Sequence, residues 1–194
     1  MQSLPSGFSL GPFRLVRQLG RGGFAPVWLA EEIHDGLRLR DVAIKLFFLP
    51  DGIDPTSPEA ARRRELILDE ARALCRVEHP AVVRLLGVTR DDPHAVIGLV
   101  MEHVPGRSLD LVLRERGRLT LVEVLDAGIT VAWALSAVHQ AGLVHRDVKP
   151  ANIIAGPAGY KLIDFGIHAP VSADATDERP LTGTPGFIAP ECLE

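Results

Sequence analysis

Cysteine is scarce in this chain of 194 residues, and the chain has no excess of positive charge. Cys75 and Cys192 are too few for a disulfide framework, so nothing indicates an oxidising compartment. With 21 basic and 25 acidic residues, the net charge of −4 argues against a nonspecific nucleic-acid surface or a polybasic membrane anchor. No apolar run reaches the length of a membrane span, and the N-terminus has no basic, apolar leader. We therefore expect a cytoplasmic location and no membrane segment.

The residues that are present form a pattern of strands around one helix. Apolar residues make up 46% of the chain and charged residues 24%, as in ordinary soluble globular proteins. Ser57 and Pro58 are typical of a helix start and predict a helix that runs to about Val77. Runs rich in β-branched and aromatic residues predict strands at residues 13–19, 27–31, 41–49, 82–88 and 95–101.

Helices dominate the chain after residue 108. Thr120 and Glu123 have the spacing of a capping box, which predicts a helix that runs to about His139. The strand-rich and helix-rich parts meet near residues 102–106. The helical period predicts one buried face on the second helix, made of Leu125, Ile129, Ala132, Leu135 and Val138.

A glycine-rich turn lies between the first two predicted strands, where residues Gly20 to Ala25 read Gly-Arg-Gly-Gly-Phe-Ala. A dinucleotide-binding loop of similar spacing is followed directly by a helix, but here Pro26 leads into another strand-like run. A glycine loop between two strands suits a lid whose N–H groups approach phosphate. An ordinary tight turn explains the same residues equally well.

Lys45 interrupts an apolar strand, on the same face as Ala43 and Phe47. A lone lysine in a strand usually points to water, but the following helix changes this interpretation. Glu70 falls within an apolar stripe of that helix, where a carboxylate needs a partner. We therefore predict an ion pair between Lys45 and Glu70 that would aim the ammonium at phosphate. The stripe consists of Leu66, Glu70, Ala73, Leu74 and Val77.

The run from His145 to Asn152 reads His-Arg-Asp-Val-Lys-Pro-Ala-Asn and lies between two apolar runs. A solvated loop could have this composition, but the enclosing apolar residues count against it. Asp164, followed by Phe165 and Gly166, comes directly after the next predicted strand. The oxygen groups of Asp147, Asn152 and Asp164 are of the type that Mg²⁺ binds together with phosphate and water. Phosphoryl transfer needs mainly such positioning and charge neutralisation.

Together these motifs resemble those of protein kinases, most closely the bacterial serine/threonine kinases. The resemblance covers residue 13 to the last residue and rests on the order of five motifs. These are Val42-Ala43-Ile44-Lys45, Glu70, the run 145–152, Asp164-Phe165-Gly166 and Ala189-Pro190-Glu191. It implies an α+β bilobal fold: an antiparallel-sheet N-lobe with one main helix at about 11–102, a hinge at about 102–106, and a partial, mostly helical C-lobe at about 107–194.

The resemblance implies an enzyme that uses ATP and Mg²⁺ to phosphorylate serine or threonine hydroxyls of proteins. Lys45, paired with Glu70, would hold the α- and β-phosphates under the glycines Gly20, Gly22 and Gly23. Asp147 would accept or orient the hydroxyl proton, and Lys149 would meet the γ-phosphate. Asn152 and Asp164 would bind Mg²⁺. Leu19, Val27, Ala43 and Ile154 would enclose the adenine, with Met101 behind it and the hinge from Glu102 to Val104 at its edge.

Two further residues of the resemblance imply that the phosphorylated hydroxyl belongs to serine or threonine. Lys149 and Thr184 match the serine/threonine kinases, in which such a threonine bridges the residues corresponding to Asp147 and Lys149. Arg146 matches an arginine that often receives an activating phosphate. The hydroxyls available for that phosphate are those of Ser172, Thr176 and Thr182.

Three features depart from the family pattern. Ala25 replaces the third glycine and is followed by Pro26, which removes a backbone donor. His168 stands where many relatives carry Ala-Arg. The chain ends at Glu194, where the family has further helices, so we expect a domain truncated after Ala-Pro-Glu. Two alternatives stay open: a catalytically weak pseudokinase or ATP-binding regulatory module, and a small-molecule kinase, against which the Thr-Pro-Gly to Ala-Pro-Glu segment counts.

Overall fold

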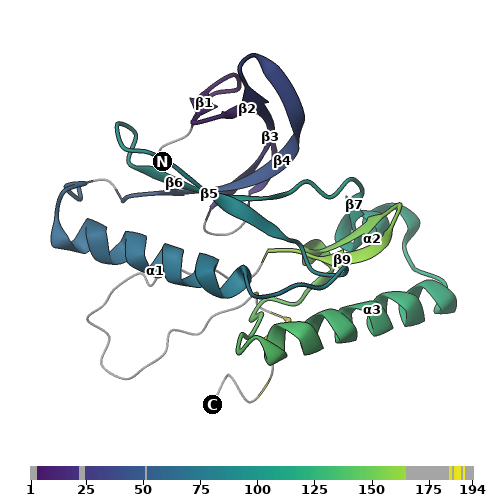
Figure 1. The fold of residues 1–194 in the computed structure, drawn as a ribbon. Coiled ribbons are helices and arrows are strands. Elements are labelled where there is room, and N and C mark those ends of the chain that lie inside the picture. The colour runs from purple at the N-terminus through teal and green to yellow at the C-terminus, as the bar shows by residue number, and fades with distance from the viewer. Residues whose placement is uncertain are drawn as a thin grey trace. The chain divides into compact units, whose positions relative to one another are not determined.

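The chain divides into two compact units, which are described separately (Figure 1). The structure is a computed structural model that describes residues 4–21, 25–50, 52–164, 184, 186–188 and 190, without the side chains of Arg21, Glu70 and Ala73. Met1–Cys75 and Arg84–His103 form the first unit, and Arg76–Val83 and Val104–Glu194 form the second. The division at His103 falls within the predicted hinge range, whereas residues 76–83 belong to the second unit and not to the strand-rich part.

The first unit is built on a six-stranded antiparallel sheet with the strand order β1-β2-β3-β4-β6-β5. The predicted strands are present, with ends that differ by a few residues. The strand predicted to begin at Val82 begins instead at Leu85, because Val82 and Val83 pair with the second unit. The strands are β1 (Ser9–Leu10), β2 (Phe13–Arg21), β3 (Pro26–His34), β4 (Leu37–Phe48), β5 (Leu85–Asp91) and β6 (Val96–Glu102).

The core of the first unit lies on one face of this sheet. Val42, Ile44 and Leu46 alternate along β4 and are fully buried in a cluster that includes Leu10 and Leu15. β1 and β5, the two ends of the strand order, contact each other, so the sheet curls around this cluster. The opposite face of β4 carries the residues that the sequence assigns to nucleotide binding.

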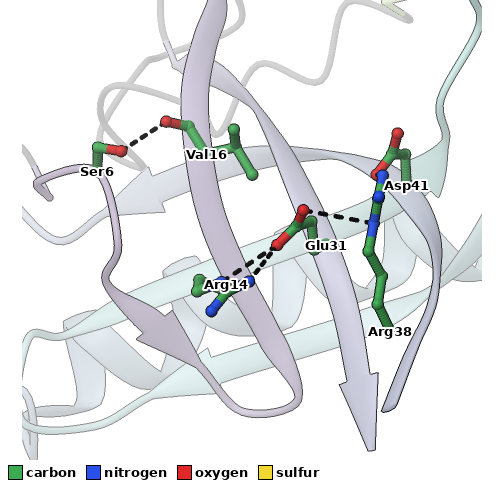
Figure 2. A network of polar contacts seen from close by, with 6 residues as sticks. All are labelled: Ser6, Arg14, Val16, Glu31, Arg38 and Asp41. Carbon is green, nitrogen blue, oxygen red and sulfur yellow. Dashed lines mark hydrogen bonds and ion pairs between the residues drawn. The ribbon is translucent and has the colours of Figure 1, made fainter. Parts of the chain in front are cut away.

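Charged residues cross-link three strands at the surface of the sheet (Figure 2). The Arg14 guanidinium on β2 lies 2.6 Å from the Glu31 carboxylate on β3. The same carboxylate forms a second ion pair, at 3.3 Å, with Arg38 on β4. Arg38 reaches Asp41 at 2.5 Å. Exposed pairs of this kind contribute about 0–1 kcal/mol each, so they refine the strand pairing that the core already determines.

Helix α1 (Pro58–Leu74) completes the first unit. The Ser57 hydroxyl caps it by accepting a hydrogen bond of 3.2 Å from the Ala60 N–H, as predicted. The predicted apolar stripe is right at Leu74 and Val77, which are buried, but wrong at Leu66, which is exposed. The other buried positions of the helix are Ala60, Ile67 and Ala71. Both sets of residues follow the helical period, and the packing decides between them.

The second unit has a three-stranded antiparallel sheet with the order β7-β8-β9. Residues 81–83 run along β9 and are hydrogen-bonded to it: Leu162 N–H donates to the Ala81 carbonyl at 2.7 Å, and Val83 N–H donates to the Leu162 carbonyl at 2.9 Å. The elements are β7 (Arg107–Ser108), α2 (Leu109–Arg116), α3 (Leu121–Gln140), η1 (Pro150–Asn152), β8 (Ile153–Gly156) and β9 (Gly159–Leu162).

Helix α3 contacts β9 and begins at the predicted capping box. The predicted buried face is right at Val138, which is fully buried, but wrong at Leu125 and Ile129, which are exposed. The other fully buried side chain of the helix is that of Ala134, which was not predicted. The expectation that no apolar run is long enough to span a membrane is also wrong by length and composition, since α3 alone among the described helices meets both conditions. Core helices of soluble proteins meet the same conditions, so this finding is weak evidence for a membrane span.

Candidate active site

The second unit brings Asp147, Lys149 and Thr184 into mutual contact. The Lys149 ammonium lies 2.7 Å from Asp147 Oδ2 and donates to Thr184 Oγ1 at 2.6 Å. Thr184 Oγ1 in turn donates to Asp147 Oδ1 at 2.7 Å. The bridge expected of Thr184 is therefore present, and it joins residues far apart in the sequence through one hydroxyl.

The Asp147 carboxylate is held in its ionised form. Burial alone would raise its pKa, but the hydrogen bonds from Lys149, Thr184 and Asn152 more than offset this effect, so the pKa lies below its usual range. The side chain is only 13% exposed. A fixed, ionised and partly shielded carboxylate can orient a hydroxyl group and accept its proton.

Asn152 is oriented by Asp147. Its side-chain nitrogen donates to the Asp147 carbonyl at 2.8 Å and to Asp147 Oδ2 at 2.9 Å. Because the amide nitrogen is fixed in this way, the amide oxygen points away from Asp147, as a metal ligand would require.

The backbone brings Asp164 towards Asn152. Ile163 N–H donates to the Asn152 carbonyl at 2.9 Å, and Asp164 follows with a positive φ of 55°. Among the described residues there is no cluster of three or more His, Cys, Asp or Glu side chains that could hold a metal. Two oxygen ligands completed by phosphate and water fit Mg²⁺, so the chemistry of the donors agrees with the prediction.

The buried His145 ring links the backbone at Asp147 to the backbone at Ile163. The ring is 1% exposed, its Nε2 lies 3.1 Å from the Ile163 carbonyl, and its Nδ1 accepts a hydrogen bond of 3.3 Å from Asp147 N–H. Both contacts are satisfied by a neutral ring with the proton on Nε2. Burial lowers the pKa of His145 more than the Ile163 carbonyl and the nearby carboxylates raise it. The sequence included His145 in a motif but gave no sign of this anchoring role.

The first unit contributes a second group of predicted residues on one face of its sheet. Val27 on β3 pairs with Lys45 on β4, and Ala43 on β4 pairs with Met101 on β6. Paired residues share a face, so these four side chains lie together on the face opposite the core cluster. Lys45 is 5% exposed, and its ammonium lies 5.7 Å from the centre of the Phe47 ring. Leu19, which was also predicted to enclose the adenine, is 38% exposed.

The remaining predicted residues are placed less completely. Gly20 lies near the end of β2, Val104 directly follows the first unit, and Ile154 lies on β8 in the second unit. Gly22, Gly23, the Glu70 side chain, His168, and the hydroxyls of Ser172, Thr176 and Thr182 lie outside the described residues, so their predicted roles stay predictions.

Comparison with known proteins identifies the class to which this arrangement belongs. The protein kinase domain family matches residues 13–194, and the chain belongs to that family. Within it, the chain is similar to the probable serine/threonine-protein kinase PknB of Corynebacterium glutamicum, with 36% identity over 92% of this chain and 27% of that protein. It is 37% identical to the serine/threonine-protein kinase PknA of Mycobacterium tuberculosis, over 93% of this chain and 41% of that protein.

Solved structures agree with this assignment. The kinase domain of Mycobacterium tuberculosis PknI aligns with a TM-score of 0.66 and 28% identity, over 86% of this chain and 62% of that one. The structure of Rad53 1-466 in complex with AMP-PNP aligns with a TM-score of 0.66 and 27% identity, over 80% of this chain and 38% of that one. The α+β protein kinase fold predicted from the sequence is confirmed. The chain spans about a quarter to two fifths of the length of PknB and PknA.

Proposed function

We propose that the protein is an ATP-dependent serine/threonine protein kinase. The observation that supports this most directly is the contact of Asp147 with Lys149, Thr184 and Asn152, because it fixes an ionised carboxylate beside a cation and an oxygen ligand. The protein substrate would supply the hydroxyl, and the similarity to PknA and PknB favours serine or threonine. A cytoplasmic location is part of the same proposal.

In the proposed reaction, Asp147 holds the serine or threonine hydroxyl and accepts its proton. The hydroxyl oxygen bonds to the γ-phosphorus as the bond from that phosphorus to the departing ADP oxygen breaks. Lys149 lies beside Asp147 and would neutralise charge on the transferred group, as Lys45 would on the other phosphates. Asn152 and Asp164 would hold Mg²⁺, which supplies further neutralisation of phosphate charge when bound.

Phosphate transfer from labelled ATP to a generic protein acceptor tests this proposal. We expect Asp147→Asn to lower the rate by orders of magnitude, because the neutral amide cannot accept the proton. Lys45→Met should do the same, while Glu59→Gln, at an exposed pair in α1, should leave the rate unchanged. Phosphoamino-acid analysis should find phosphoserine or phosphothreonine, and mainly phosphotyrosine would contradict the proposal.

The alternative is a member of the family that binds ATP with little or no transfer. The exposed apolar residues of α3, among them Ile129 and Trp133, favour it, because they leave the helix that contacts β9 incompletely packed. Binding of ATP in a direct titration, together with equal transfer rates for the wild type and Asp147→Asn, would establish this alternative.

A further inference from the structure

The Glu102 carboxylate links the two ends of residues 84–103, the second of the two segments that form the first unit. The chain enters this part at Arg84 and leaves it at His103. Glu102, at the end of β6, accepts a hydrogen bond of 2.8 Å through its carboxylate from the Arg84 N–H. The Glu102 N–H donates to the Arg84 carbonyl at 3.0 Å. The two bonds close a ring between Arg84, the first residue of this segment, and Glu102, the residue before its last.

This arrangement differs from a regular rung between antiparallel strands. In such a rung the two residues exchange main-chain N–H and carbonyl bonds. Here the Arg84 N–H donates to the carboxylate of Glu102 in place of the Glu102 main-chain carbonyl. The Glu102 side chain thereby helps to set the direction in which the chain leaves the sheet at His103.

The entering side of this ring is also fixed. Val83 directly precedes Arg84, and its N–H donates to the Leu162 carbonyl on β9 at 2.9 Å. Leu162 is fully buried and its own N–H donates to the Ala81 carbonyl. Arg84 therefore directly follows a residue whose own N–H is hydrogen-bonded to β9.

We propose that Glu102 is a positioning residue, whose side-chain bond to the Arg84 N–H holds the backbone of residues 102–104 in the form that receives the adenine. This proposal rests on the proposed function and on the resemblance to protein kinases, which implies that residues 102–104 contact the edge of the adenine. Without the carboxylate, the Arg84 N–H either loses its partner or recruits the main-chain carbonyl of residue 102. The first outcome removes the restraint on residue 102, and the second changes its backbone directly.

Two substitutions of similar size separate the hydrogen bond from the other properties of Glu102. Glu102→Gln keeps an oxygen that can accept the Arg84 N–H, and Glu102→Met has none. Loss of one such bond corresponds to roughly a tenfold change in affinity. We therefore expect Glu102→Met to raise the Kd and KM for ATP by about tenfold with a smaller change in kcat, and Glu102→Gln to restore most of the affinity. Glu59→Met is the matched control.

Amide hydrogen exchange reports on the bond without activity. We expect the Arg84 amide to exchange faster in Glu102→Met and at the wild-type rate in Glu102→Gln, with thermal melting showing that both variants are folded. Unchanged exchange and ATP affinity in Glu102→Met would overturn the positioning role alone. Equal losses in both variants would overturn it in favour of the charge. A wild-type protein that binds no ATP would overturn the proposed function, and this role with it.

Discussion

At the scale of single residues, the Thr184 hydroxyl does two things at once. It accepts from Lys149 and donates to Asp147, so it sets the distance between the cation and the carboxylate. A hydroxyl that both donates and accepts polarises its partners in the same direction, which strengthens a network of this kind. The direct contact of Lys149 with Asp147 would remain without it, but the geometry would be less constrained.

We therefore expect Thr184→Val to lower kcat by about tenfold or more, because the variant keeps the shape but loses both hydrogen bonds. Thr184→Ser keeps the hydroxyl and should retain most of the activity. Steady-state phosphate transfer with both variants is the measurement. A Thr184→Val protein with wild-type kcat would show that the bridge has no part in catalysis.

His145 gives a prediction that depends on pH. The pKa of the buried ring is lowered in the folded state, whereas in the unfolded chain it lies near 6.5. Above that value the ring is neutral in both states and the stability is complete. As the pH falls below about 6.5, the ring is protonated in the unfolded chain but stays neutral in the folded protein. The free energy of unfolding therefore decreases with falling pH until the pH reaches the folded-state pKa.

Nitrogen chemical shifts of the imidazole, followed over a pH titration, measure this directly. We expect a neutral ring with its proton on Nε2 at pH 7, and protonation only below the usual range. Urea unfolding at several pH values should show stability falling as the pH drops below about 6.5, and His145→Gln should flatten that dependence. A His145 pKa at or above 6.5 in the folded protein would rule out the buried neutral ring.

At the same scale, the sequence predicted which residues meet but not how they are held. The order of polar residues between apolar runs identified Asp147 and Asn152, because polar groups among apolar neighbours need a function or a partner. The resemblance to protein kinases added Lys149 and the bridge by Thr184. The support from His145 depends on a backbone with positive φ at Arg146, of 64°. Local sequence gives no signal for such a conformation in a residue other than glycine, so this anchor could not be predicted.

At the scale of elements, α3 shows where helical periodicity is insufficient. The capping box located its start correctly, because a cap is a local pattern of two residues. Its buried face was predicted correctly at Val138 but wrongly at Leu125 and Ile129, since apolar residues occur nearly all around the helix and several faces fit the period. The position of β9 decides which face is covered, and that position depends on contacts distant in the sequence. The same partial error affected α1, where Leu74 is buried as predicted and Leu66 is exposed.

Paired substitutions test the observed face of α3. Val138 is fully buried, so Val138→Ala should destabilise the protein by about 1–3 kcal/mol through lost contacts and a cavity. Trp133 is 64% exposed, so Trp133→Gln should change stability by no more than about 0.5 kcal/mol despite the loss of a large side chain. Urea unfolding of both variants tests whether the side of α3 that carries Val138 is the covered one, and a larger loss from Trp133→Gln would favour a face that includes Trp133.

At the scale of the whole molecule, the sequence prediction treated each part of the chain as continuous. The division at His103 lies within the predicted hinge range. The sequence assigned Val82 and Val83 to a strand of the first unit, because apolar β-branched residues favour strands wherever they occur. Their hydrogen bonds to β9 belong to the second unit instead. A β-rich run predicts extended backbone, but its partner is set by the fold.

The two units should also differ in stability. The first closes a curled sheet around a cluster that contains Leu10, Ile44 and Leu46, all fully buried. The second leaves large apolar side chains on α3 in water, and each forgoes roughly 1.5–3 kcal/mol of burial. A protein domain is stable by only about 5–15 kcal/mol, so a few such side chains decide which unit unfolds first. We predict that the second unit of this chain loses its structure before the first.

Two probes can follow the units separately during urea unfolding of residues 1–194. Trp28 packs against the core cluster of the first unit, and Trp133→Phe leaves it as the only tryptophan, so its fluorescence reports on that unit. Amide exchange at Val138 and Leu162 reports on the second unit, where both residues are fully buried. We expect these amides to lose protection at a lower urea concentration than the Trp28 transition. Coincident transitions would mean that the two units unfold as one cooperative body, because neither would then persist without the other.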